Sequence, residues 1–140
     1  MSRVDAAGID PGAALLAVVP TVAAEAVLFE APRSVSPKIE AALRYMEENY
    51  AEPLSLAELA RRSQLSPCRF STVFRRQVGM SPQRYLCHLR VRAAQALLRR
   101  GEAPAVAAIE AGFFDQSHLN RHFKRICGAT PARFAAASAS

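Results

Sequence analysis

The chain has 140 residues, of which 51% are hydrophobic and 21% are charged. These proportions exclude a disordered protein and fit one ordinary domain or two very small ones. The net charge of +6 is uneven, because residues 1–37 carry two basic and four acidic side chains and residues 38–140 carry sixteen and eight. The basic part favours a polyanionic partner, nucleic acid before a membrane, although charge alone fits a domain with an Arg-rich surface equally well.

The N-terminal segment and the cysteines both bear on the cell compartment. Residues 13–29 are apolar, but Pro20 and Glu25 interrupt them, and two Asp and one Arg precede them. The run is short for a membrane span and its flank has the wrong charge for a signal peptide. We therefore expect no membrane contact, and predict that residues 1–36 are an extension, either an extra strand or helix or the remnant of a sensor domain. Three widely spaced cysteines without a C-x-x-C pair favour a reducing cytoplasm.

From residue 36 onward, the sequence predicts an all-α fold of about seven helices. Four pairs each supply an N-cap hydroxyl and a proline at the first helical position: Ser36-Pro37, Ser66-Pro67, Ser81-Pro82 and Thr130-Pro131. Ser55 and Glu58 have the spacing of a capping box, and Asp115 is a further N-cap. Glycines fall where helices would end, at Gly79, Gly101, Gly112 and Gly128. The predicted helices are at about 37–49, 56–63, 67–78, 82–99, 104–111, 115–127 and 131–136.

The chain also contains an internal repeat. Residues 66–85 align with residues 115–134 at a constant offset of 49, so that apolar, basic, Gly and Ser/Thr-Pro positions coincide. The preceding helices match at an offset of 48, and one extra residue, Phe114, accounts for the difference. The repeat predicts two copies of one unit, in which a short helix, a tight turn and a longer helix follow each other. This is the helix-turn-helix plan.

Helical spacing divides the longer helix of each unit into two faces. In the second unit the predicted buried stripe is Leu119, His122, Phe123 and Ile126, and the outward residues are Gln116, Ser117, Asn120, Arg121 and Lys124. In the first unit the stripe is Phe70, Val73 and Phe74, and the outward residues are Pro67, Cys68, Ser71, Thr72 and Arg75. Gln and Asn can pair with adenine, Arg with guanine and Ser with either. The phosphate-contact candidates lie further along, at Arg75, Arg76, Lys124 and Arg125.

The histidines of the second unit raise the alternative of a metal or catalytic site. His118 and His122 are four residues apart on one helix, a spacing that can bind a metal. A catalytic zinc helix of this kind has Glu after the first His, whereas this chain has Leu119, and His88 lies on another predicted helix. The chain has no G-x-S-x-G sequence and no Gly-rich phosphate loop. We therefore expect no metal, no cofactor and no enzymatic activity.

The second-unit run G-F-F-D-Q-S-H-L-N-R-H-F-K-R, followed by G-A-T-P-A-R-F, resembles the DNA-binding domain of AraC/XylS-type bacterial transcription regulators. The first unit, L-S-L-A-E-L-A-R-R-S-Q-L-S-P-C-R-F-S-T-V-F-R-R-Q-V-G-M-S-P-Q-R-Y-L, and the long helix after it fit the same pattern. The resemblance covers about residues 38–136. It implies a homeodomain-like domain at 37–137, with helix-turn-helix units at about 55–80 and 104–128 and a linker helix at about 82–100.

What the resemblance implies for function is a sequence-specific regulator of transcription whose two units enter successive major-groove segments. It assigns base contacts to Gln116, Ser117, Asn120 and Arg121 in the second unit. In the first unit it assigns them to Cys68, Ser71 and Thr72, with Arg69 adjacent. It further implies double-stranded DNA and RNA polymerase as partners, a monomer or weak dimer, and a place at the nucleoid in the bacterial cytoplasm. Activation and repression both stay open.

Two departures from the family pattern keep a second function open. The reading positions of the first unit are small, so its base contacts would be few, water-mediated or mostly to the DNA backbone. Family members usually carry a larger sensing domain ahead of this module, for which 37 residues are too few, so we expect a minimal regulator or one that has lost its sensor. The alternative is a low-specificity or antagonist DNA-binding protein, and a protein–protein module comes third.

Overall fold

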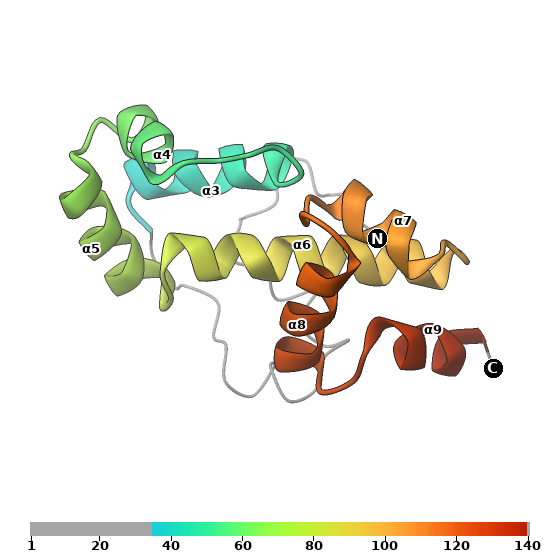
Figure 1. The fold of residues 1–140 in the computed structure, drawn as a ribbon. Helices are drawn as coiled ribbons and strands as arrows, with labels where there is room; N and C mark the ends of the chain where they lie inside the picture. The colour runs from blue at the N-terminus through green and yellow to red at the C-terminus, as the bar shows by residue number, and fades with distance from the viewer. Residues whose placement is uncertain (1–34, 140) are drawn as a thin grey trace.

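The fold is a set of short helices arranged around one long helix. The computed structural model describes residues 35–139, and all regular structure in that range is helical. The helices are α3 (Pro37–Asn49), α4 (Leu56–Arg62), α5 (Pro67–Val78), α6 (Pro82–Arg99), α7 (Pro104–Ala111), α8 (Gln116–Cys127) and α9 (Pro131–Ala139). α6 runs through the middle, with α3, α4 and α5 around its first half and α7, α8 and α9 around its second half (Figure 1). The prediction of an all-α fold with about seven helices is confirmed.

The expectations about compartment are tested only in part. The predicted N-terminal extension lies outside the described residues, except for its last two positions. Within residues 35–139, no helix combines the length and apolarity needed to cross a membrane. The three cysteines all lie in this range and are free thiols.

Side-chain caps start the helices where the sequence predicted them. Four hydroxyls accept the N–H of the residue three positions on, at 3.2–3.5 Å, and they belong to Ser36, Ser66, Ser81 and Thr130. Three helices end at glycines in the left-handed conformation, Gly79, Gly112 and Gly128. The observed bounds agree with the predicted ones to within one residue, except that α9 continues three residues further, to Ala139.

Two separate hydrophobic cores hold the helices together. The first lies between α3, α4, α5 and the N-terminal half of α6, and Phe74 is fully buried in it. The second lies between the C-terminal half of α6 and the helices α7, α8 and α9, and Phe123 is fully buried there. On α6 the first core ends at Leu89 and the second begins at Val91. Each half of the molecule therefore has a core of its own, and α6 contributes to both.

The internal repeat forms two helix-turn-helix units, α4–α5 and α7–α8. Their turns contain a residue in the left-handed conformation at corresponding positions, Gln64 with φ 59° and Gly112 with φ 100°. The extra residue of the second turn, Phe114, is 83% exposed. The insertion therefore points outward and leaves the register of the core unchanged.

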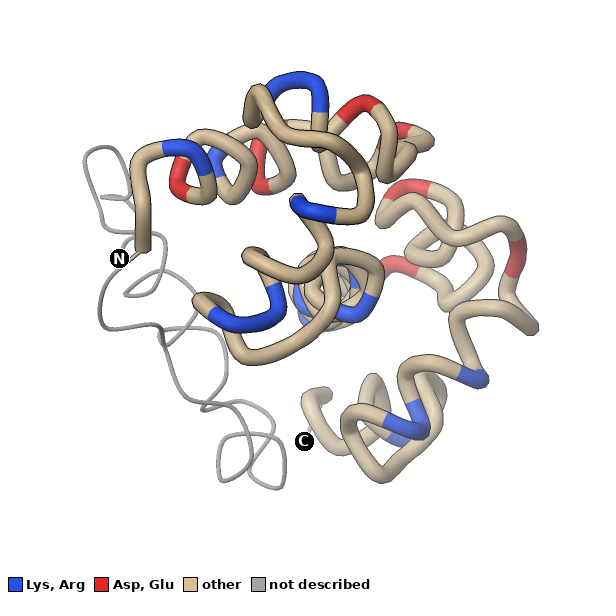
Figure 2. The backbone as a smooth tube through the Cα atoms, turned by 90° about the vertical axis from the view of Figure 1, so that its left-hand side faces the viewer, with Lys and Arg blue, Asp and Glu red and all other residues tan. Residues whose placement is uncertain are grey.

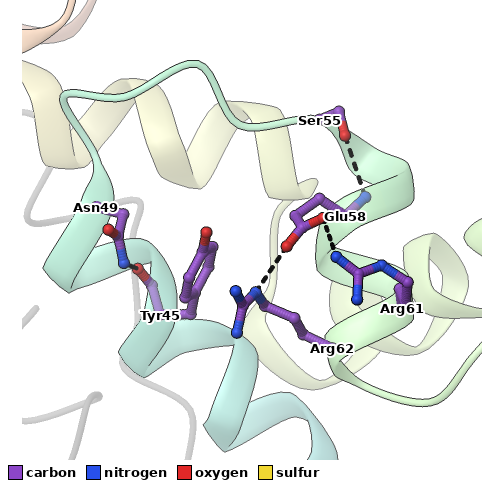
Figure 3. A network of polar contacts seen from close by, with 6 residues as sticks. All are labelled: Tyr45, Asn49, Ser55, Glu58, Arg61 and Arg62. Carbon is purple, nitrogen blue, oxygen red and sulfur yellow. Dashed lines mark hydrogen bonds and ion pairs between the residues drawn. The ribbon is translucent and has the colours of Figure 1, made fainter.

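A polar network joins α4 to α3 and corrects one prediction. Ser55 caps α4 by accepting the N–H of Glu58 at 3.1 Å. The Glu58 carboxylate does not complete the predicted capping box, because it accepts hydrogen bonds from Arg61 and from Nε of Arg62 (2.8 Å), as Figure 3 shows. These two bonds lower the pKa of Glu58. They also hold the Arg62 guanidinium 3.9 Å from the ring centre of Tyr45 on α3, in a cation–π contact.

The second core predicts a large difference in stability between two phenylalanine variants. Phe123→Ala should lower the free energy of unfolding by about 3–5 kcal/mol, because it leaves a cavity at a fully buried site. Phe114→Ala is the matched control, and its exposed ring should contribute less than about 0.5 kcal/mol. Urea unfolding followed by circular dichroism measures both losses. Similar losses for the two variants would contradict the placement of Phe114 outside the core.

His88 on α6 should make the stability depend on pH. Its ring is buried, and this burial, together with the charges of Arg84 and Arg125, lowers the pKa of His88 to about 4. Below about pH 6.5 the unfolded chain therefore binds a proton at His88 that the folded protein does not bind. The free energy of unfolding should therefore decrease as the pH is lowered. Between about pH 7 and 5 the loss should be about 2 kcal/mol. Urea unfolding at both pH values measures it, and a His88→Leu variant with the wild-type pH slope would show that another group is responsible.

Candidate nucleic-acid interface

α8 presents the polar face that the sequence predicted for it. Asp115 caps the helix by accepting the N–H of His118 at 2.8 Å, and three apolar side chains anchor the helix in the second core. Four outward residues are exposed, Gln116, Ser117, Arg121 and Lys124, and a fifth is half-buried, Asn120. A shallow depression on this face is lined by Ser117, Asn120, Arg121, Lys124, Arg125 and Thr130. The polar residues of the second unit thus share one open surface.

His122 lies at the edge of α8 and not in the buried stripe where helical spacing placed it. Its ring is half-buried, stacks on Phe113 at a centroid distance of 6.0 Å, and accepts a hydrogen bond from Arg125 at 2.8 Å. The ring centroids of His118 and His122 are 4.8 Å apart. The Nδ1 atom of His118 accepts a hydrogen bond from the N–H of Phe114 at 3.1 Å. Partial burial, His118 and Arg125 lower the pKa of His122. Both histidines therefore support the turn and the start of α8.

The histidines and cysteines are the candidate metal ligands in the described part of the chain. No three His, Cys, Asp or Glu side chains there are placed to hold a metal ion. Cys87 lines the same cleft as His118 and His122, but burial raises the pKa of its thiol. The Arg125 guanidinium contacts the Cys87 Sγ at 3.7 Å. At neutral pH Cys87 is therefore a thiol and a weak nucleophile.

α5 carries a plainer outward face than α8. Cys68, Arg69 and Thr72 are exposed, and Ser71 is half-buried. The Thr72 hydroxyl donates to the carbonyl oxygen of Cys68 at 3.1 Å, so its proton is already used within the helix. The last turn adds two exposed arginines, Arg75 and Arg76. The first unit therefore offers positive charge but little hydrogen-bonding variety.

Charge is separated between the helices. α5, α6, α8 and α9 carry eleven Lys and Arg and no Asp or Glu, whereas the eight acidic residues of the described part lie in α3, α4, α7 and the loops. Figure 2 shows Asp and Glu in the upper half of the view, and only Lys and Arg in the lower half. The longer helix of each unit is therefore purely basic in its charged residues, which attracts a polyanion.

A cleft between the two units was not predicted from the sequence. It has a volume of about 460 Å³, and its walls come from the α3–α4 loop, α6, the second turn and α8. Arg90 lines it and donates from Nε to the carbonyl oxygen of Tyr50 at 2.7 Å. No motif marks Arg90 as functional, because its partners are main-chain oxygens about 40 residues away in the sequence.

Both the sequence and the fold are similar to those of known proteins. Residues 59–137 match the family model described as "Helix-turn-helix domain". The arabinose operon regulatory protein of Escherichia coli K12 is 33% identical over 101 residues, which cover 71% of this chain and 35% of that protein. The virulence regulon transcriptional activator VirF of Yersinia enterocolitica is 33% identical over 91 residues, covering 64% and 34%. This chain thus spans about a third of the length of these relatives.

Solved structures share the arrangement of helices. The DNA-binding domain of AdpA, solved with a target DNA, has a TM-score of 0.69 and 30% identity, and the match covers 73% of this chain and 93% of that one. A transcriptional regulator of the AraC type from Chromobacterium violaceum has a TM-score of 0.69 and 27% identity, covering 74% and 94%. Because the family model covers more than half of the sequence and both units recur in these structures, the chain belongs to the AraC-type family of helix-turn-helix domains.

Proposed function

We propose that this chain is a sequence-specific, double-stranded DNA-binding regulator of transcription that reads two adjacent major-groove segments. One observation carries the proposal: two copies of a helix-turn-helix unit share α6, and their longer helices present polar faces without a carboxylate. Both of these helices, α5 and α8, have 12 residues, and a helix of this kind fits the major groove. Membership of a family of regulators supports the same function.

Docking on the DNA backbone is the task that we assign to the basic residues at the ends of α5 and α8. Arg75, Arg76 and Lys124 are exposed and point away from the cores, so each can reach a phosphate. Arg125 is exposed as well, but its guanidinium donates to His122 and contacts Cys87. Lys124 is therefore the stronger phosphate-contact candidate of the second unit.

Base reading falls mainly to α8 in this proposal. Gln116, Ser117, Asn120 and Arg121 share the outward face of α8 and supply amide, hydroxyl and guanidinium groups, which can distinguish base edges. In the first unit Cys68, Ser71 and Thr72 are short, and Arg69 is the one long polar side chain among the four candidates. We therefore assign most of the base specificity to the second unit and most of the backbone contact to the first.

The wider biological setting follows from the same proposal. We assign the DNA-binding domain to residues 37–137 and treat residues 1–36 as an extension of it. Two linked units let a monomer cover a site of two turns that has no palindrome. RNA polymerase is the second partner that we propose, since relatives of this chain are named as transcriptional activators. The cytoplasm and nucleoid of a bacterium are the corresponding location.

The proposal is tested by selecting bound duplexes from a randomised pool of about 30 base pairs at moderate salt, which suppresses nonspecific binding. Two enriched motifs about one helical turn apart are the expected result. One enriched motif would leave the first unit with backbone contacts alone. No enrichment, with binding that disappears as salt rises, would overturn the proposal of a sequence-specific regulator.

Arg121→Ala tests base reading by α8. It should weaken binding to the selected duplex by about 1–3 kcal/mol and relax the preference at one base pair, because one bidentate contact is lost. Arg44→Ala removes an arginine of α3 that pairs with Glu40, and should leave both affinity and preference unchanged. Titrations on selected and random duplexes measure the effects. An equal loss on both duplexes for Arg121→Ala would mean that Arg121 contacts the backbone.

Lys124→Ala tests phosphate contact. It should weaken binding to selected and random duplexes alike, because a phosphate contact carries no sequence information. It should also reduce the slope of log K against log salt by about one unit, as one counterion fewer is released. Affinities at four or more salt concentrations measure the slope. A wild-type slope with lost affinity would indicate that Lys124 acts through the structure of α8.

A further inference from the structure

On α6, Arg90 lies between the last buried residue of the first core and the first buried residue of the second. Leu89 belongs to the first core and Val91 to the second. Helical spacing puts the α6 residues of the two cores on different sides of the helix, roughly 140° apart, with Arg90 between them. Each unit is therefore attached to its own side of α6, and apart from α6 itself their relative orientation depends on direct contacts between them.

Arg90 ties the first unit to α6 beyond the limit of the first core. Its Nε donates to the carbonyl oxygen of Tyr50 at 2.7 Å, and its Nη2 donates to that of Glu52 at 2.9 Å. Tyr50 is the residue that ends α3, so the loop after α3 is drawn towards the middle of α6. Hydrogen bonds from a charged donor are stronger and shorter than neutral ones, and the planar guanidinium gives them a defined direction.

Gly112 brings the second unit against the same loop. A Cβ atom at this position would lie 2.9 Å from Cα of Ala51, 2.9 Å from Nε of Arg90 and 3.0 Å from the carbonyl oxygen of Tyr50. Only a residue without a side chain therefore lets the turn of the second unit approach so closely. The other glycines with positive φ have open space at the corresponding position, Gly79, Gly101 and Gly128. The approach to the loop is thus a property of Gly112 and not of helix ends in general.

We propose that Arg90 and Gly112 form a clamp that holds the two helix-turn-helix units in one relative orientation and so sets the spacing of the two DNA segments that the protein accepts. The inference rests on the proposed function. One added base pair moves the second segment by about 3.4 Å and rotates it by about 34°. A rigid pair of units cannot follow that change, whereas a pair without a contact beyond α6 can follow it further, because α6 can bend and twist. Arg90 and Gly112 are positioning residues and need not touch DNA.

The first test measures the orientation without DNA. Residual dipolar couplings of the full chain should fit one alignment tensor for the amides of α3, α4 and α5 and of α7, α8 and α9. In Arg90→Gln the couplings should require two tensors, because the loop is released while both cores persist. Arg99→Gln is the matched control, since it removes the same charge from α6 but its guanidinium lies over Phe134 within the second unit. A single tensor for Arg90→Gln, identical to the wild type, would overturn the clamp.

The second test measures the tolerance of spacing on DNA. Wild type and Arg90→Gln are titrated with the selected duplex and with versions carrying one base pair more or one fewer between the motifs. Wild type should lose at least about tenfold in affinity on the altered duplexes, because the second unit can no longer bind at the same time as the first. Arg90→Gln should lose less than about threefold. Equal spacing penalties in both proteins would overturn the inference while leaving the DNA-binding proposal intact, and absence of selective binding by wild type would overturn the DNA-binding proposal instead.

Gly112→Ala provides a second variant with its own control. It should remove the spacing penalty as Arg90→Gln does, because the added Cβ pushes the loop away from the turn. Gly101→Ala places the same side chain at a similar φ, +94° against +100°, but in open space. It should keep the wild-type spacing penalty. If Gly101→Ala lost the penalty as fully as Gly112→Ala, backbone strain and not the approach to the loop would be the cause, and Gly112 would have no part in the clamp.

Discussion

Both halves of the molecule depend on sharing one helix. The other helices have between 7 and 13 residues, and helices of this length are marginal in water without packing partners. Three such helices bury too little apolar surface for an independent domain. α6 supplies the missing wall to each group, with Leu89 at the end of one core and Val91 at the start of the other. Each unit therefore has its own core, but takes one wall of that core from the shared α6.

The two units keep one backbone plan and differ in what surrounds it. In the first turn Gln64 occupies the left-handed conformation, at φ 59°, which a residue with a side chain can adopt at some cost. In the second turn the corresponding residue is Gly112, and a Cβ atom there would meet the loop after α3. The glycine is therefore favoured both by the turn, where φ is 100°, and by the contact between the units. The outward faces differ as well, since α8 offers amides and a guanidinium where α5 offers mostly short side chains.

Local chemistry could be predicted from the sequence, whereas contacts between distant segments could not. Caps such as Ser66 gave helix bounds to within a residue, because the hydroxyl and the N–H that it accepts are three positions apart. Helical spacing placed His122 in the core, but the ring lies at the edge of the core. Spacing gives the direction of a side chain around the helix axis and not how deeply that side chain is buried. The Glu58 capping box failed because two nearby arginines compete for the carboxylate. Arg90 binds main-chain oxygens, which every residue carries, so no sequence pattern could indicate its partners.

The distribution of charge connects the fold with binding. On α3 and α4, carboxylates stand next to basic residues and pair with them, as Glu40 does with Arg44 and Glu58 with Arg62. α5 and α8 contain no carboxylate, so their Lys and Arg have no opposite charge on their own helix. Like charges gathered on one surface repel one another and oppose the compact state. A bound polyanion would attract these Lys and Arg side chains and so offset the repulsion between them. Without a bound polyanion, the apolar cores and the shared α6 must therefore offset this repulsion.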